Sequence, residues 1–116
     1  MNQTMGKAGE ETALEFLQQQ GYSLVCRNYR CRFGEIDLIL RKDNLLIFAE
    51  VKTRRSQRYG LPRESVTPSK QNTIRKTALQ YIQRYQIREM QLRYDVIEVY
   101  QNVIPEKVIH LANAFM

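Results

Sequence analysis

The segment Gly34–Arg54, GEIDLILRKDNLLIFAEVKTR, constrains the fold more than any other part of this sequence. Two apolar runs rich in β-branched residues, 36–40 and 46–51, lie on either side of the turn-forming segment 42–44 (Lys-Asp-Asn). This pattern predicts a β-hairpin. If residues 43 and 44 form a two-residue turn, residues whose numbers sum to 87 lie opposite each other.

This register places two carboxylates side by side, because Asp37 then faces Glu50. Directly opposed side chains on paired strands have Cβ atoms about 4.5–5.5 Å apart. Carboxylates this close repel each other, and burial strengthens the effect. Mg²⁺ or Mn²⁺, which prefer carboxylate and water oxygens, would relieve the repulsion. Lys52 points into the same space, because side chains two residues apart share a strand face.

The hairpin therefore predicts a metal site suited to phosphodiester hydrolysis. An alternative interpretation is that Asp37 and Glu50 are solvated polar residues on a hairpin with one wet face. The apolar residues Ile39 and Phe48 on the same face favour a sheet that is covered on both sides.

Asp37, followed after twelve residues by Glu50-Val51-Lys52, resembles the signature of PD-(D/E)xK nucleases. Ile36 stands where the signature has its proline. With GEIDLI and FAEVKTR, nearly the whole chain resembles the YraN family of small bacterial proteins, which are similar to archaeal Holliday junction resolvases and restriction endonucleases. The resemblance implies a restriction-endonuclease-like α/β/α sandwich. It also implies one or two Mg²⁺ ions held by Asp37, Glu50 and the backbone carbonyl of Val51, with Lys52 orienting or deprotonating water.

Residues 6–20 have apolar side chains at helical spacing and predict a helix. Glu10 lies at the N-terminal end of its apolar stripe. One interpretation is an acid that complements the helix dipole. The other follows from the resemblance, because Gly6, Gly9 and Glu10 match a G-x-x-G-E pattern expected at the family's active site. We favour a third acidic group at the metal site.

Thr67 and Pro68 predict the start of a second helix, as N-cap and first helical residue, and the helix extends to about Arg84. Gln71 lies at the start of its apolar stripe, beside Lys70. The related family has a Lys-Gln pair here, which implies a residue that orients water or phosphate. A partly buried structural amide explains Gln71 equally well.

The net charge of +6 and the pI near 9.5 favour a polyanionic partner, nucleic acid first. The resemblance to DNA-cleaving families implies DNA more than RNA. Basic residues flank the hairpin on both sides, and we predict that they contact the nucleic-acid backbone. They are Arg27, Arg30, Arg54, Arg55, Arg58 and Lys70. A plain solvated surface is the alternative for each of them.

The 116 residues fit a single domain, 1–116. Further strands are predicted over 22–31 and 92–100, and the segment 108–115 is predicted to be a short strand or turn that closes the core. The elements predict a three-layer α/β sandwich around a mixed sheet of four or five strands. There is neither a long apolar run nor a basic, apolar leader, so we expect a cytoplasmic protein with no membrane partner.

Four remaining polar residues receive structural interpretations. Cys26 and Cys31 are expected to be reduced thiols, and their odd spacing predicts opposite faces of a strand. Asp95 is expected to pair with Arg93 or another basic neighbour. His110, the only histidine, is expected to be packed or on the surface.

Two other classes of function remain open. The chain could be a nucleic-acid-binding module that keeps the nuclease fold but cleaves little alone, or a protein–protein adaptor. The archaeal Holliday junction resolvases to which the family is similar usually act as symmetric dimers, so a homodimer is one option. No apolar surface stripe in the sequence fixes such a dimer.

Overall fold

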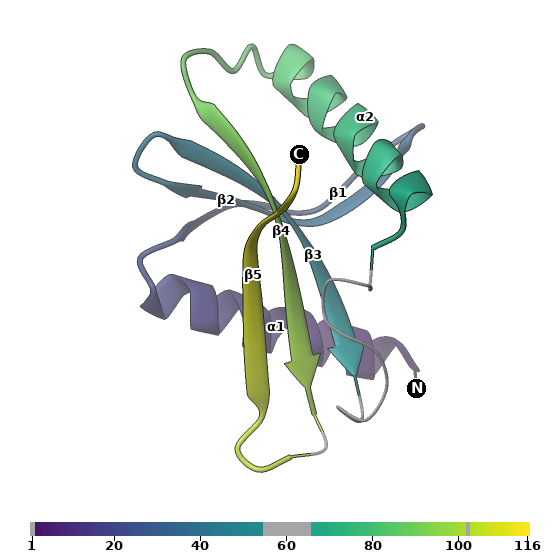
Figure 1. Ribbon diagram of the computed structural model, residues 1–116, viewed down its shortest axis with the longest axis vertical. Helices are drawn as coiled ribbons and strands as arrows, with labels where there is room; N and C mark the ends of the chain where they lie inside the picture. Colours follow the sequence, from purple (N-terminus) through teal and green to yellow (C-terminus); the bar gives the residue numbers. More distant parts are fainter. Residues whose placement is uncertain (1, 55–65, 102) are drawn as a thin grey trace.

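The computed structural model describes residues 2–54, 66–101 and 103–116. Two helices and five strands make up the fold (Figure 1). In chain order they are α1 (Asn2–Gln19), β1 (Ser23–Cys31), β2 (Gly34–Lys42), β3 (Leu45–Arg54), α2 (Pro68–Arg84), β4 (Gln91–Tyr100) and β5 (Lys107–Phe115). No helix in these ranges is long and apolar enough to cross a bilayer.

The five strands form one mixed sheet in the order β1-β2-β3-β4-β5. All neighbours are antiparallel except β3 and β4, which are parallel and have α2 between them in sequence. The hairpin register predicted from the sequence is confirmed, because Leu38 pairs with Ala49 and Ile39 with Phe48. Asp43 has a φ of 54°, as a tight hairpin turn requires.

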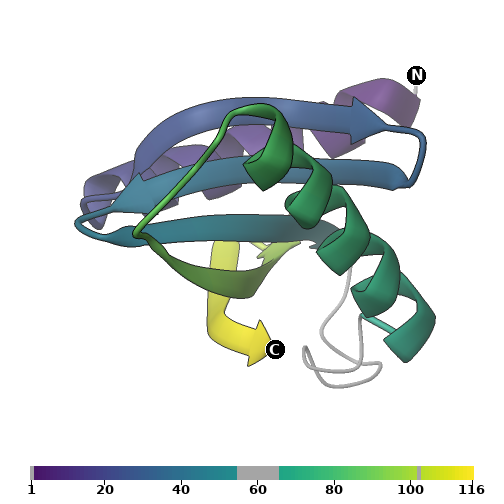
Figure 2. The ribbon, with the colours of Figure 1, turned by 90° about the horizontal axis from the view of Figure 1, so that it is seen from above.

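The helices cover opposite faces of the sheet, which gives the predicted three layers (Figures 1 and 2). Ala13, Leu14 and Leu17 of α1 bury one face. Ile74, Ala78 and Tyr81 of α2 bury the other. Because β3 contributes apolar side chains to both faces, it lies at the centre of the core.

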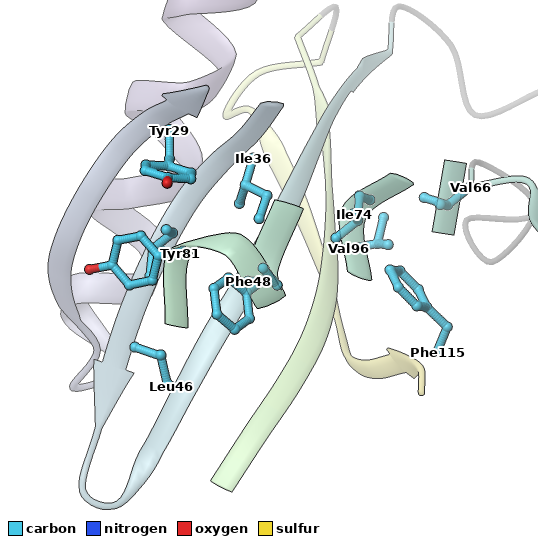
Figure 3. Close-up of a cluster of buried hydrophobic side chains, with 11 residues drawn as sticks. Tyr29, Ile36, Leu46, Phe48, Val66, Ile74, Tyr81, Val96 and Phe115 are labelled. Atoms are coloured by element: carbon cyan, nitrogen blue, oxygen red, sulfur yellow. The ribbon is translucent and has the colours of Figure 1, made fainter. Parts of the chain in front are cut away.

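The aromatic side of the core lies under α2. Tyr81 makes edge-on ring contacts with Tyr29 of β1 and Phe48 of β3 (Figure 3). Phe48 also stacks on Tyr94, which stacks in turn on Phe115 near the end of β5. The C-terminal segment, predicted as a short strand or turn, is thus a nine-residue strand that completes the core.

Helix α2 begins as the sequence predicts. Thr67 has extended backbone angles, and its hydroxyl accepts a hydrogen bond from the N–H of Lys70 at 3.2 Å. Pro68 occupies the first turn, where its missing N–H costs nothing. The cap fixes where the first turn of α2 meets the end of β3.

The regular alternation of side chains between the two faces of the sheet is interrupted near Asn28, whose φ is 51°. Ile36 and Ile39 of the neighbouring strand are three residues apart, yet both pack into the cluster under α2. Cys26 and Cys31 also pack against that cluster, and both thiols are free. The prediction of opposite faces for the two cysteines is therefore wrong, because a left-handed residue between them shifts the alternation.

Candidate active site

Asp37 and Glu50 converge where β2 and β3 separate. The last backbone pair of the hairpin on this side is Leu38–Ala49. Beyond it, the N–H of Val51 donates a hydrogen bond to Oδ2 of Asp37 at 2.8 Å. Glu50 is 5% exposed, so its carboxylate is held inside the protein.

The electrostatics of Asp37 show how closely the two acids interact. The pKa of Asp37 is raised to about 7, mostly by burial and then by the charge of Glu50 and a hydrogen bond with it. The bond from Val51 acts in the opposite direction, and Glu10 adds a smaller repulsion. Near neutral pH, the pair therefore exchanges a proton and would gain from a bound cation.

Two ammonium groups lie against the buried acid. Nζ of Lys52, on β3, is 3.3 Å from Oε2 of Glu50, and Nζ of Lys70, on α2, is 3.5 Å from the same oxygen. The sequence analysis assigned Lys70 to the nucleic-acid backbone. Its contact with Glu50 places it within the carboxylate cluster, which it reaches because the cap at Thr67 sets the first turn of α2 beside β3.

Glu10 approaches the cluster from α1. A Cβ atom added at Gly9 would lie 2.2 Å from Oγ1 of Thr53, so the absence of a side chain at Gly9 lets α1 lie directly on β3. Glu10 accepts a hydrogen bond from Nδ2 of Asn28 at 3.2 Å. The sequence analysis did not single out Asn28, because only its left-handed backbone conformation brings it to Glu10.

Among the described residues, no three Asp, Glu, His or Cys side chains are gathered closely enough to form a complete metal cage. The donor set is two carboxylates, Asp37 and Glu50, and the backbone of Val51. In a strand, the N–H and C=O of one residue point to the same side, so the carbonyl of Val51 faces the side of Asp37. Hard oxygen donors and few protein ligands suit Mg²⁺, which keeps several waters and binds substrate phosphates.

Gln71 has protein partners for both ends of its amide. Its Nε2 donates to the carbonyl of Val66 at 3.1 Å, and its Oε1 accepts from Arg75 at 3.3 Å. These contacts favour the structural interpretation of Gln71. Its side chain ties the first turn of α2 to Val66, just before the helix.

The predicted nucleic-acid contacts fall into three groups. Arg27 pairs with Glu11 and Arg30 with Glu35, so their charges are partly offset. Arg54 lies at the end of β3, beside the site. Arg55 and Arg58 lie outside the described residues.

The sequence analysis missed Glu98, which is 1% exposed and accepts a 2.9 Å hydrogen bond from Nε of Arg54. A signal existed, because Glu98 interrupts the apolar run of β4. In the parallel register, Glu98 lies beside Lys52. Glu98 therefore holds the guanidinium of Arg54 through its Nε atom.

Asp95 belongs to a separate buried network. It accepts two hydrogen bonds from Arg93, at 2.9 and 2.8 Å, and one from the N–H of Asn113 at 2.9 Å. Nε2 of His110 lies 2.7 Å from Oδ2 of Asp95. The predicted pairing of Asp95 with Arg93 is confirmed, and His110 is a packed residue as expected.

Comparison with known proteins shows which family this chain belongs to. The model of the uncharacterised protein family UPF0102 matches residues 9–99, which include both carboxylates and both lysines of the site. A UPF0102 protein of Caldanaerobacter subterraneus is 44% identical over 115 residues, which cover 97% of this chain and 94% of the relative. A UPF0102 protein of Caldicellulosiruptor saccharolyticus is 44% identical over 99 residues, or 85% and 84% of the two chains. A third, of Symbiobacterium thermophilum, is 46% identical over 99 residues, or 85% and 84%. This chain therefore belongs to the UPF0102 family, the YraN family that its sequence resembles.

Proposed function

We propose that this protein is a Mg²⁺- or Mn²⁺-dependent endonuclease that hydrolyses phosphodiester bonds in nucleic acid, DNA more than RNA, with branched or structured DNA as a candidate substrate. The observation that carries the proposal is the pairing of Asp37 with Glu50. Burial and mutual repulsion raise the pKa of Asp37 to about 7. Packing alone does not explain two carboxylates this close together, because their mutual repulsion destabilises the fold unless a cation offsets it.

Asp37, Glu50 and the carbonyl of Val51 would hold the metal, with Glu10 nearby. When bound, such a metal polarises the phosphate and lowers the pKa of a water molecule. Glu10 is close enough to Asp37 to raise its pKa slightly, and its carboxylate is held by Asn28.

The lysines supply the charge that the phosphate requires. Lys52 borders Glu50 and would orient the attacking water or accept its proton, since an amine next to the reacting oxygen acts as a general base. Lys70 would offset the negative charge that builds up on the phosphate oxygens. Glu50 holds both ammonium groups in place before the substrate arrives.

Arg54 would bind the neighbouring phosphate. Its guanidinium is held at Nε by buried Glu98, so the terminal amino groups keep a fixed direction. Arginine forks of this kind bind phosphate through two parallel hydrogen bonds. The remaining positive charge contributes to backbone affinity without reading the base sequence.

The test is a cleavage panel of linear duplex, single-stranded, branched and RNA substrates, with Mg²⁺, Mn²⁺ or EDTA. We expect cleavage only with metal. We also expect its loss in Lys52→Ala, with an unchanged unfolding transition. Arg88→Ala, which removes one exposed charge from the loop after α2, is the control and should cleave like the wild type.

Three outcomes, from the panel and from binding measurements on the same substrates, would replace the proposal. Cleavage that survives both Asp37→Ala and Glu50→Ala would exclude this site as its source. Salt-sensitive binding without metal-dependent cleavage would identify a binding module. Absence of any affinity for DNA or RNA would favour a protein–protein adaptor.

A further inference from the structure

A hollow lies on the side of the β1–β2 ribbon that faces α2. Its volume is about 610 Å³, and it is bordered by the turn between β1 and β2 and by the middle of α2. The turn is pressed onto the helix, because a Cβ atom added at Gly34 would lie 2.5 Å from Cγ2 of Thr73. This contact fixes one wall of the hollow, which we call the turn–helix groove.

Two exposed apolar side chains line the turn–helix groove. Phe33, in the turn, is 40% exposed, and Leu79, on α2, is 55% exposed. The guanidinium of Arg32 lies 4.9 Å from the centre of the Phe33 ring. An aromatic ring and an arginine plane are the two surfaces on which unpaired bases stack.

The polar lining of the groove is basic and amide-bearing. Arg32 and Lys76 supply positive charge, and Gln80 and Gln83 supply side-chain amides. No acidic side chain is among the described residues that line it. The groove therefore combines a flat apolar surface with cations, which suits a ligand with both a ring and a phosphate.

We propose that the turn–helix groove binds an unpaired nucleotide of the substrate, with the base stacked on Phe33 and its phosphate beside Arg32 and Lys76. The proposal rests on the proposed function and specifies its substrate class: nucleic acid with single-stranded or splayed bases near the cleaved bond. A continuous duplex keeps its bases stacked inside and leaves the groove empty.

The position of the groove relative to the carboxylates supports this assignment. Phe33 precedes Asp37 by four residues, which is roughly 13 Å along an extended strand. Lys70, against Glu50, and Lys76, in the groove, lie six residues apart on α2, about 9 Å along the helix axis. A single strand of a few nucleotides spans both, which is within the site sizes of other single-strand grooves.

An acidic peptide is the competing occupant, and the observations favour the nucleotide. The apolar surface is one aromatic ring capped by a cation, together with one leucine. A peptide helix needs a longer row of apolar contacts, with anchors at several successive turns. Base stacking needs only one ring.

The experiment measures binding in metal-free buffer with EDTA, so that cleavage plays no part. The probes are a fluorescein-labelled oligothymidylate and a labelled blunt-ended duplex of matched length. We expect tighter binding of the single strand. Phe33→Ala should weaken that binding by about tenfold, in line with the loss of one base–aromatic stack, and leave the duplex affinity within about twofold.

Matched variants separate stacking from general effects. Leu92→Ala removes a side chain of similar exposure, 44%, at the start of β4 and should change nothing. Phe33→Tyr keeps the ring and should retain binding. Lys76→Gln should reduce the salt dependence of single-strand binding, whereas the control Arg88→Gln should leave both affinities within about twofold of the wild type. Since Phe33 lies in an exposed turn, thermal unfolding should be unchanged in Phe33→Ala.

Oligonucleotides carrying 2-aminopurine give a second readout. Stacking on Phe33 should quench the fluorescence of one position in the wild type and not in Phe33→Ala. Equal affinity of wild type and Phe33→Ala for the single strand would overturn the groove proposal. Displacement by polyglutamate, unaffected by Phe33→Ala, would overturn it in favour of a peptide.

The two proposals fail separately. Metal-dependent cleavage that Lys52→Ala abolishes, together with no effect of Phe33→Ala on binding, removes the groove alone. Binding that depends on Phe33 without any cleavage removes the endonuclease alone.

Discussion

The N–H of Val51 donates to Oδ2 of Asp37 at 2.8 Å, and this bond replaces the next backbone pair of the β2–β3 hairpin. The hairpin thus opens at the position where its two acids face each other. A side chain, rather than a carbonyl, accepts from Val51, so Asp37 is fixed in place while its charge is disfavoured by burial and by Glu50. Burial and Glu50 make the protein sensitive to pH, because they raise the pKa of Asp37 against the opposing effect of this bond.

Without metal, the protein should lose stability as pH rises from about 4 to about 7. In the folded state the pKa of Asp37 is about 7, against an ordinary value of 3.8. Between these values the unfolded chain releases a proton that the folded chain keeps, so ionisation favours unfolding. Asp37→Asn should therefore be more stable than the wild type at pH 8, by up to about 4 kcal/mol, and nearly equal to it at pH 4. Urea unfolding across this range measures the difference.

Glu15→Gln is the control for this pH series, because Glu15 is exposed on α1. It should follow the wild-type profile. A wild-type stability that is flat between pH 5 and 8 would contradict the burial of an ionised Asp37.

Metal affinity should rise with pH over the same window. A metal binds the ionised form of Asp37, so binding must release the proton that burial retains. Calorimetric titration of Mn²⁺ in two buffers with different ionisation enthalpies should show proton release near pH 6.5 and little near pH 8.5. Glu50→Gln should abolish the binding, and Glu15→Gln should not. Affinity independent of pH would mean that the metal binds elsewhere.

Much of this site follows from local sequence. The short turn and the two apolar runs fix the hairpin register, because a slip of one residue would move every core side chain of both strands to the wrong face. Once the register is fixed, Asp37 and Glu50 must be neighbours. The cap of α2 is equally local, since Thr67 and Pro68 specify it by themselves.

The parts that sequence alone did not predict depend on contacts between distant segments. Asn28 adopts a left-handed conformation within a strand and bonds to Glu10 of α1. Glu98 becomes a partner of Arg54 only through the parallel pairing of β3 and β4. Gln71 is a different case, because its partners Val66 and Arg75 are local and the sequence alone does not show to which of its neighbours the amide bonds.

Gly9 and Gly6 should respond differently to the same substitution. An added methyl group at Gly9 would lie 2.2 Å from Oγ1 of Thr53, whereas Gly6 has nothing within 4 Å. Gly9→Ala should therefore cost about 1–3 kcal/mol, as overpacking does. Gly6→Ala should be neutral or slightly stabilising, because alanine favours the helix. Chemical unfolding of both variants makes the comparison.

The same pair tests the placement of Glu10. If α1 must lie on β3 to bring Glu10 to the site, Gly9→Ala should reduce cleavage more than its loss of stability explains, when measured well below its unfolding transition. Equal activity of the two alanine variants would show that the close approach at Gly9 serves packing alone.

Asp95 should be important for stability and not for nucleic-acid binding. Burial would raise its pKa, but His110, Arg93 and the N–H of Asn113 together hold the pKa below its ordinary value. Asp95→Ala leaves Arg93 without its carboxylate and should cost about 3–5 kcal/mol at pH 7. Because the folded pKa is lowered, this stabilisation should shrink as pH falls below about 4.

Asp95→Asn keeps the shape of the side chain and separates charge from packing. It can still accept hydrogen bonds, so it should lose less stability than Asp95→Ala and show a weaker dependence on pH. Neither variant should change single-strand affinity when the protein is folded, because Asp95 bonds to Arg93, His110 and Asn113 rather than to the lysines around Glu50. A fall in affinity equal to that of Lys52→Ala or Lys70→Ala would mean that the buried network positions the site, and the division between the two clusters would be wrong.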